Sequence, residues 1–169
     1  MPTTVQFIMT SAHDIQRRQN GSLIYVPAIP SRAGLYIIDH NGFYIGTSRD
    51  LKERFQARLA ALWELGVDPP PPDEMNIELY RIEVGGTSTA PDDNGRCEIN
   101  VQTGPMWVRT IIDVEHLLIR IFTEDFNQNI RNSEKWQNLF YNPFPDALVW
   151  SVADGSGTYT GRIAYNGSL

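Results

Sequence analysis

The chain has 169 residues and a mass of 19.2 kDa, the size of one ordinary domain. Hydrophobic residues make up 41% and charged residues 20% of the sequence, which excludes disordered and collagen-like classes. No apolar run approaches the roughly 18 residues of a membrane-spanning helix, and the N-terminus lacks the pattern of a signal peptide. We therefore expect one cytoplasmic domain over residues 1–169 that does not bind membranes.

The charge is unevenly distributed. The net charge is −6, yet residues 1–62 hold seven basic and four acidic side chains, whereas residues 63–100 hold two basic and nine acidic ones. Because phosphate neutralisation by Lys and Arg supplies most non-specific affinity for nucleic acids, a basic surface from the first third of the chain is compatible with DNA binding. The only cysteine, Cys97, can form no internal disulfide; its surroundings predict an exposed loop or edge strand, and we assign it no role.

In chain order, the first element expected is a strand over 5–9, and the polar stretch 11–22 indicates a short helix followed by a turn. GLYIID (34–39) and FYIGT (43–47) are β-rich runs separated by His40-Asn41-Gly42, which predicts a β-hairpin. Residues 48–65 follow as a helix, capped by Ser48 or Asp50. One apolar stripe of that helix consists of Leu51, Phe55, Leu59 and Leu62.

The second half of the chain predicts four further elements. Residues 75–84 indicate a third strand, 85–96 a loop, 107–126 a central helix that is apolar nearly all round, and 147–165 a terminal hairpin. The expected fold class is α+β: a small, mostly antiparallel sheet, with a three-stranded core that includes hairpin 34–47, flanked by helices. Elements at both termini extend this core.

Glu115 is the strongest functional candidate that needs no family knowledge. On a helix over 107–126 it shares one face with Ile111, Leu118 and Phe122. A carboxylate in an apolar stripe is costly unless it is paired, hydrogen-bonded or bound to a cation. A salt bridge to Arg54 or Arg109 and a metal site both satisfy this condition. Asp113, His116, Arg120 and Glu124 fall on other faces and are interpreted as polar cover.

The hairpin register decides whether two tyrosines can act together. Side chains alternate along a strand, so a two-residue turn would place Tyr36 and Tyr44 on opposite faces. A three-residue loop with Gly42 in the left-handed position pairs Ile38 with Tyr44 and Tyr36 with Gly46, which places both tyrosines on one face. We expect the three-residue loop. Packing is the ordinary role of a strand tyrosine and stays open as the alternative.

Arg54 and Arg58 lie four residues apart on the expected first helix and project together. The planar fork of a guanidinium suits phosphate, because it offers two hydrogen bonds at fixed charge. A solvated helix face beside Lys52 and Glu53 is the alternative interpretation.

Together these motifs resemble the GIY-YIG nuclease signature. GLYIID and FYIG match its two strand motifs, Arg54 lies ten residues after Tyr44, and the later helical glutamate and asparagine are matched by Glu115 and Asn127. The matched motifs span about residues 30–132; the acidic, proline-rich stretch 66–100 resembles an insertion, and 133–169 is a C-terminal extension. At the position of Arg58 the family often has His or Tyr, which can transfer a proton. Arginine is not suited to that auxiliary role.

The resemblance implies a metal-dependent endonuclease that hydrolyses DNA phosphodiester bonds. Glu115 would bind one Mg²⁺ or Mn²⁺ ion, Tyr36 would activate the attacking water, Tyr44 would help place it, and Arg54 would stabilise the phosphoryl charge. Asn127 would hold a neighbouring phosphate. Contacts to double-stranded DNA are expected from four further arginines, Arg17, Arg18, Arg49 and Arg58.

The stand-alone size resembles family members that act as restriction endonucleases, commonly as homodimers. Two alternatives stay open: a GIY-YIG-like module without turnover that binds nucleic acid or protein, and a nuclease toxin.

Overall fold

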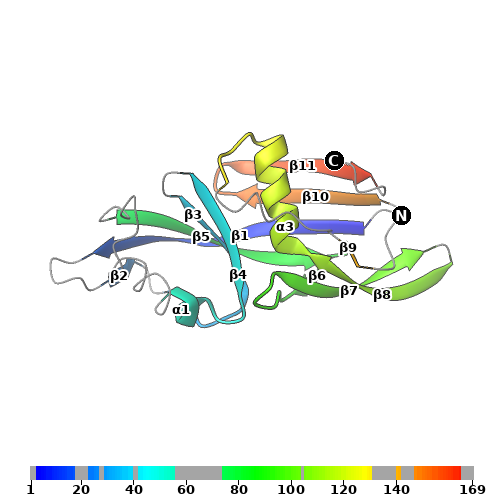
Figure 1. Ribbon diagram of the computed structural model, residues 1–169, viewed down its shortest axis with the longest axis horizontal. Coiled ribbons are helices and arrows are strands. Elements are labelled where there is room, and N and C mark those ends of the chain that lie inside the picture. Colours follow the sequence, from blue (N-terminus) through cyan, green and yellow to red (C-terminus); the bar gives the residue numbers. More distant parts are fainter. Residues whose placement is uncertain are drawn as a thin grey trace.

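The structure is a computed structural model that describes residues 3–17, 23–26, 29–39, 42–55, 74–103, 105–130, 140–141 and 147–164. Figure 1 shows a long twisted sheet with a helix across it and a second, smaller sheet at one end. The strands are β1 (Thr3–Arg17), β2 (Leu23–Val26), β3 (Gly34–Asp39), β4 (Phe43–Ser48), β5 (Glu74–Val84), β6 (Thr87–Thr89), β7 (Arg96–Thr103), β8 (Met106–Asp113), β9 (Phe140–Tyr141), β10 (Ala147–Asp154) and β11 (Gly157–Ala164). The helices are α1 (Leu51–Arg54), α3 (Val114–Arg120) and the π-helical turn η2 (Ile121–Asp125).

The large sheet has eight strands in the described residues, in the order β11-β10-β1-β5-β3-β4, with β2 paired to β1 and β6 paired to β5. It is mixed, because β1 and β10 are parallel. The smaller sheet has the order β7-β8-β9. The fold is therefore mostly β, and the expected small sheet flanked by helices is only partly confirmed. The expected three-stranded antiparallel core is present as β5-β3-β4, within a larger sheet.

Strand β5 is a central member of this sheet although it lies inside the acidic stretch 66–100. Its residues pair with β1 on one side and with β3 on the other. The third strand predicted over 75–84 is confirmed, as is the terminal hairpin, which is formed by β10 and β11. Part of the supposed insertion therefore belongs to the core.

Two apolar clusters cover the two faces of the sheet. Along β3, β4 and β5, residues alternate between the two clusters: on β5, Ile77 and Leu79 belong to one cluster, whereas Tyr80 and Ile82 belong to the other. The larger cluster packs under α3 and η2, and Figure 1 shows this helix lying across the strands. The smaller cluster includes Leu51 and packs under α1.

Two secondary-structure predictions were wrong. The stretch 11–22 does not begin with a helix, because β1 continues to Arg17 after a bulge between Met9 and Ser11 and pairs with β5 and β2. The helix expected over 107–126 begins only at Val114, because β8 extends to Asp113. In β8, Thr110, Ile111 and Ile112 are β-branched residues that favour a strand.

Two smaller corrections concern β6 and β7. The loop expected over 85–96 contains the short strand β6. Cys97 lies on β7, an edge strand of the smaller sheet as expected, but it is buried instead of exposed. Of the first helix, the structure describes the start at Leu51 with Asp50 as its N-cap; Leu59, Leu62 and the rest of that prediction lie outside the described residues. Within the described part of the chain, no helix is long and apolar enough to cross a bilayer.

Candidate functional site

Tyr36 and Tyr44 lie on one face of the β3–β4 hairpin, as the register predicts. Tyr36 pairs with Gly46 and Ile38 with Tyr44, around a loop in which Gly42 has φ 110°. The two rings are stacked with centroids 6.3 Å apart. The Tyr36 phenol lies over Gly46, where an added Cβ would collide with its hydroxyl group. Glycine at this position thus makes the room that the phenol occupies.

Arg54 is the last residue of α1 and directly precedes Phe55, which packs on Tyr36. The Asp50 carboxylate accepts a hydrogen bond from the Glu53 amide, which fixes the start of this short helix. Phe55 is buried and its ring meets that of Tyr36 edge to face, with centroids 4.7 Å apart. Because the next residue is anchored in the core, the Arg54 side chain is held at the boundary of the fold and is only 16% exposed.

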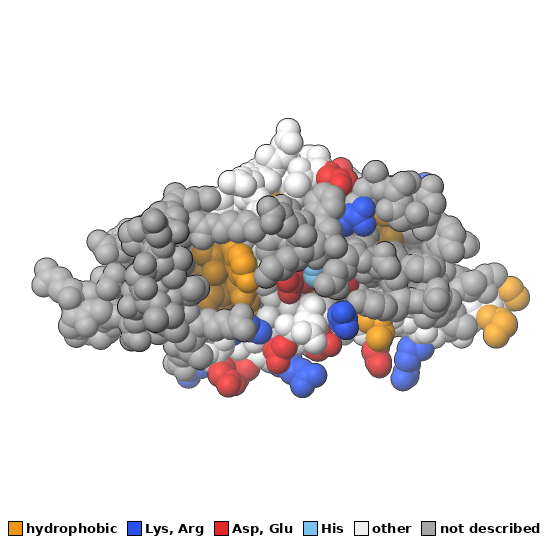
Figure 2. Space-filling view, viewed as in Figure 1, with side chains coloured by type: hydrophobic (Ala, Val, Ile, Leu, Met, Phe, Trp, Pro, Cys, Tyr) orange, Lys and Arg blue, Asp and Glu red, His pale blue; other side chains and the backbone are white. Residues whose placement is uncertain are grey.

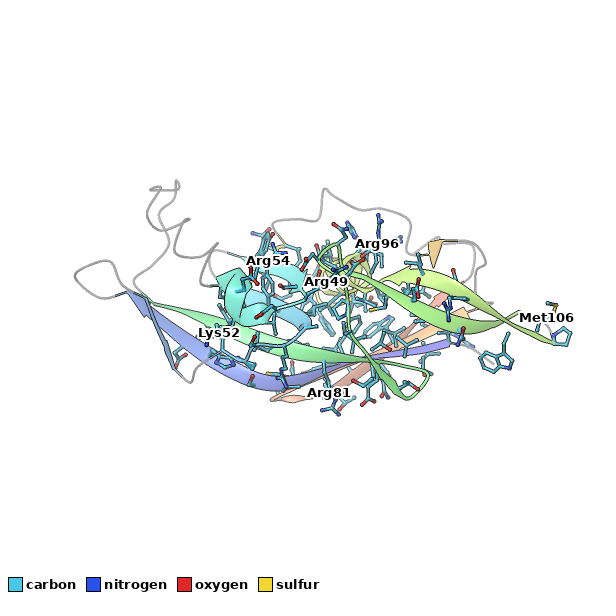
Figure 3. The ribbon with its side chains drawn as sticks, turned by 90° about the horizontal axis from the view of Figure 1, so that it is seen from below. Arg49, Lys52, Arg54, Arg81, Arg96 and Met106 are labelled. Carbon is cyan, nitrogen blue, oxygen red and sulfur yellow. The ribbon has the colours of Figure 1, made fainter. Side chains whose placement is uncertain are left out.

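An acidic loop between β6 and β7 faces Arg54. A guanidinium nitrogen of Arg54 lies 3.8 Å from Oδ1 of Asp93, and the same oxygen accepts a hydrogen bond of 2.9 Å from the Arg49 amide. Figure 3 shows Arg49, Arg54 and Arg96 along the same side of the molecule. Asp93 is exposed, so this ion pair is weak and a phosphate can compete for Arg54.

Glu115 occupies the first turn of α3. The Thr47 hydroxyl donates a hydrogen bond of 2.8 Å to its Oε2. The carbonyl of Gly95 accepts hydrogen bonds from the Val114 and Glu115 amides, at 2.9 and 3.4 Å. Gly95 has φ 80°, and an added Cβ would meet both Glu115 and the Thr47 hydroxyl. The loop, β4 and α3 therefore hold this carboxylate jointly.

The surroundings of Glu115 disfavour its charged form. Burial, the largest effect, raises the pKa of Glu115, and the nearby Asp113 carboxylate raises it further. The Thr47 hydrogen bond and the charges of His116 and Arg54 act in the opposite direction but do not prevail. A bound cation would relieve this unfavourable state.

Asp113 and His116 form a buried pair at the start of α3. Oδ1 of Asp113 accepts a hydrogen bond from the His116 amide, and Oδ2 lies 2.8 Å from Nδ1 of the His116 ring. Asp113 is 1% and His116 7% exposed. The interpretation of these two residues as polar cover was wrong. For Asp113, the error followed from starting the helix too early, which also placed Ile111 on the face of Glu115, although Ile111 is in β8.

The structure arranges the predicted site residues in two groups on either side of β4. Thr47, which binds Glu115, and Gly46, which lies under Tyr36, are neighbours and face opposite sides of the sheet. Strand β4 is the last strand along the sheet order in the described residues. The tyrosines and the glutamate are thus separated by the thickness of one edge strand.

Arg54 is the residue that relates to both groups. Its neighbour Phe55 packs on Tyr36, and its own charge offsets a small part of the rise in the pKa of Glu115 that burial causes. Figure 2 shows acidic, basic and histidine side chains close together near the middle of one face.

The remaining predicted site residues lie elsewhere or are not described. Asn127 is exposed, has φ 57° and follows η2, so it lies at the opposite end of the helical segment from Glu115. Arg17 is the last residue of β1; Arg18 and Arg58 lie outside the described residues. Arg49 lies near the site through its amide contact with Asp93.

Three residues that hold the site were not singled out from the sequence: Thr47, Asp93 and Gly95. The sequence signal for Gly95 is the turn-forming run Asp92-Asp93-Asn94-Gly95, in which the Asp92 carboxylate accepts amide hydrogen bonds from Asn94 and Arg96. No local pattern indicates that this turn meets Glu115.

The residues present fit a hard divalent cation at Glu115, which is a partly buried carboxylate with one oxygen fixed by Thr47. In the described part of the chain, no three His, Cys, Asp or Glu side chains converge as a ligand group. A cation bound here would keep most of its ligands as water and phosphate oxygens.

No known protein family matches this chain, and neither a curated protein nor a solved structure is significantly similar to it. The resemblance to GIY-YIG nucleases therefore rests on the motif residues alone.

Proposed function

We propose that the chain is a divalent-metal-dependent endonuclease of the GIY-YIG type that hydrolyses phosphodiester bonds in double-stranded DNA, with site-specific restriction as its role. The observation that carries the proposal is the position of Arg54. It adjoins the ring packed on Tyr36, and its charge acts on the Glu115 carboxylate. In this proposal, one phosphate at the edge of β4 meets the Tyr36 phenol, the Arg54 guanidinium and the Glu115 carboxylate.

Each residue has a distinct part in this reaction. The Tyr36 hydroxyl orients the attacking water and takes part in moving its proton, and Tyr44, stacked beside it, limits where that water can lie. Arg54 exchanges its weak contact with Asp93 for the phosphate and stabilises the charge that develops there. Glu115 would hold Mg²⁺ or Mn²⁺, and the ion would supply positive charge that offsets the negative charge developing in the reaction.

A binding module without turnover is the second candidate, and one observation favours it. Tyr36 is only 5% exposed and is enclosed by Gly46 and Phe55, an environment that also suits a tyrosine with a packing role. If this candidate is correct, Tyr36→Phe leaves every functional readout unchanged.

Nicking of supercoiled plasmid separates the two candidates. The wild-type protein is expected to convert supercoiled to open-circular DNA with Mg²⁺ and not with EDTA. Glu115→Gln and Arg54→Ala are each expected to slow nicking by on the order of 100-fold or more, because each removes a charge that acts on the transition state. Glu53→Gln, the same substitution at an exposed position of α1, is the matched control and keeps the wild-type rate. Nicking that persists in purified Glu115→Gln would reject the proposal.

A further inference from the structure

The β7–β8 hairpin extends away from the candidate site. It begins at Arg96, directly after Gly95, and its register runs from Arg96 opposite Asp113 to Thr103 opposite Met106. Strands rise about 3.4 Å per residue, so the far end lies roughly 24 Å from the base. Figures 1 and 3 show the hairpin projecting at one end of the molecule, with Met106 at its end.

The two faces of this hairpin differ in chemistry. One face is buried and carries Cys97, Ile99, Thr110 and Ile112. The opposite face is exposed and carries Glu98, Asn100, Trp107 and Arg109. Among the described residues, Trp107 and Met106 are two of the three large apolar side chains with high exposure, at 68% and 63%. Figure 2 shows exposed hydrophobic side chains at this end of the molecule.

A cleft of about 620 Å³ separates the exposed face from the end of the large sheet. Asn100, Trp107 and Arg109 line its hairpin side, and Thr4 and Thr87 line the side formed by the large sheet. This volume lies in the range of sites that hold single small ligands, and the walls combine an indole, a guanidinium, an amide and hydroxyl groups.

These groups match the parts of a nucleotide. An exposed indole stacks on bases of any sequence, and threonine hydroxyls and arginine bind phosphate and sugar oxygens. Arg109 is already paired with Glu98, but at 3.8 Å and with both side chains more than 60% exposed the pair is weak. Arg109 is therefore available to a phosphate.

We infer that this cleft binds a nucleotide of the substrate strand that is unpaired or flipped out of the duplex, with its base stacked on Trp107 and a phosphate on Arg109. The inference rests on the proposed nuclease function, and it specifies which part of the substrate the cleft binds. A base inside a duplex offers no free face to an indole, and a cleft of this volume admits one strand and not two.

The spacing relates this cleft to the cut. Arg109 is opposite Asn100 and Trp107 is opposite Gln102, four and six residues beyond Arg96, or about 14 and 20 Å along β7. Stacked nucleotides of one strand advance about 3.4 Å each, so the bound nucleotide lies about four to six positions from a phosphate at the base of the hairpin.

Binding in EDTA tests the cleft independently of catalysis. Fluorescence anisotropy of a labelled 12-nucleotide oligo(dT) is measured with the full chain, with Trp107→Ala and with Met106→Ala. Trp107→Ala is expected to weaken binding about 5- to 100-fold, because one stacked base is lost. Met106→Ala, a truncation at the adjacent and equally exposed position, is the matched control, with less than a twofold change.

Charge variants test the phosphate contact. Arg109→Ala is expected to reduce the slope of log K against log salt by about 0.7, the value for one phosphate of a single strand. Glu98→Gln is expected to tighten binding, because it removes a like charge beside that phosphate. Circular dichroism and melting curves check that each exposed substitution leaves the fold intact.

The outcomes separate this inference from the nuclease proposal. Loss of oligo(dT) binding in Trp107→Ala supports the cleft whether or not the protein cuts DNA. Unchanged binding in both Trp107→Ala and Arg109→Ala overturns the cleft, even if nicking depends on Glu115. Indole fluorescence that responds to neutral oligosaccharides and not to oligo(dT) also overturns it, in favour of a sugar site.

Discussion

Substituting Gly95 by alanine tests the contact between the acidic loop and Glu115, because Gly86 provides a control with the same backbone conformation. Both glycines have φ 80°. Placing a Cβ in the left-handed region costs about 1–2 kcal/mol at either position. At Gly86 nothing lies within 4 Å of the added Cβ, whereas at Gly95 it would meet the Glu115 side chain, including Oε2 at 3.0 Å, and the Thr47 hydroxyl at 3.2 Å.

The difference between the two variants isolates the steric effect. Overpacking adds about 1–3 kcal/mol, so Gly95→Ala is expected to lose about 2–5 kcal/mol of unfolding free energy and Gly86→Ala about 1–2. Relieving the contact shifts Glu115 by on the order of 1 Å, which lowers the cleavage rate about 100-fold. Urea denaturation and plasmid nicking measure the two effects. Equal stability and equal nicking in both variants would refute the described contact.

Two further predictions concern charges at the site. Because the pKa of Glu115 is raised above its reference value of 4.5, the Glu115 carboxyl binds its proton more tightly in the folded state than in the unfolded state. In EDTA, the unfolding free energy of the wild type is therefore expected to fall relative to that of Glu115→Gln as the pH rises above 4.5. Denaturation curves of both proteins at pH 4 and pH 7 measure this change, and a stability difference that does not depend on pH would contradict it. At pH 7, Mg²⁺ should raise the melting temperature of the wild type and leave that of Glu115→Gln unchanged. Asp93→Asn removes the carboxylate that pairs with Arg54, so in EDTA the protein should bind duplex DNA several-fold more tightly and with a steeper salt dependence. An unchanged affinity would indicate that the contact at 3.8 Å does not restrain Arg54.

Local signals sufficed where a single turn or cap determines the structure. His40-Asn41-Gly42 predicts the hairpin register, because a three-residue loop with positive φ at its last position permits only one pairing of Tyr36. The start of α1 follows from Asp50 as an N-cap in the same way.

Local signals failed where distant pairing decides. The polar stretch after Met9 has little strand character, yet β5 and β2 supply ladder partners for it. In residues 107–126, apolar residues nearly all round hide the change from strand to helix, and only Asp113, as a buried N-cap, marks it.

The candidate site was predictable only in part for the same reason. The pairing of Tyr36 with Gly46 follows from the hairpin sequence, but the contacts of Glu115 with Thr47 and Gly95 join segments far apart in the chain. The resemblance to GIY-YIG nucleases likewise implies that Glu115 and the tyrosines act together, whereas the structure separates them by strand β4.

In the proposed mechanism, Tyr36 and Glu115 lie on opposite sides of an edge strand and act on one phosphate. Single-turnover cleavage of a defined duplex by Tyr36→Phe, Glu115→Asp and the double variant measures this coupling directly. Each single variant should slow cleavage, and the double variant should lose less than the product of the two losses, because residues that act as a unit are not additive. A Tyr36→Phe protein that cuts at the wild-type rate, or losses that multiply independently, would contradict a shared site.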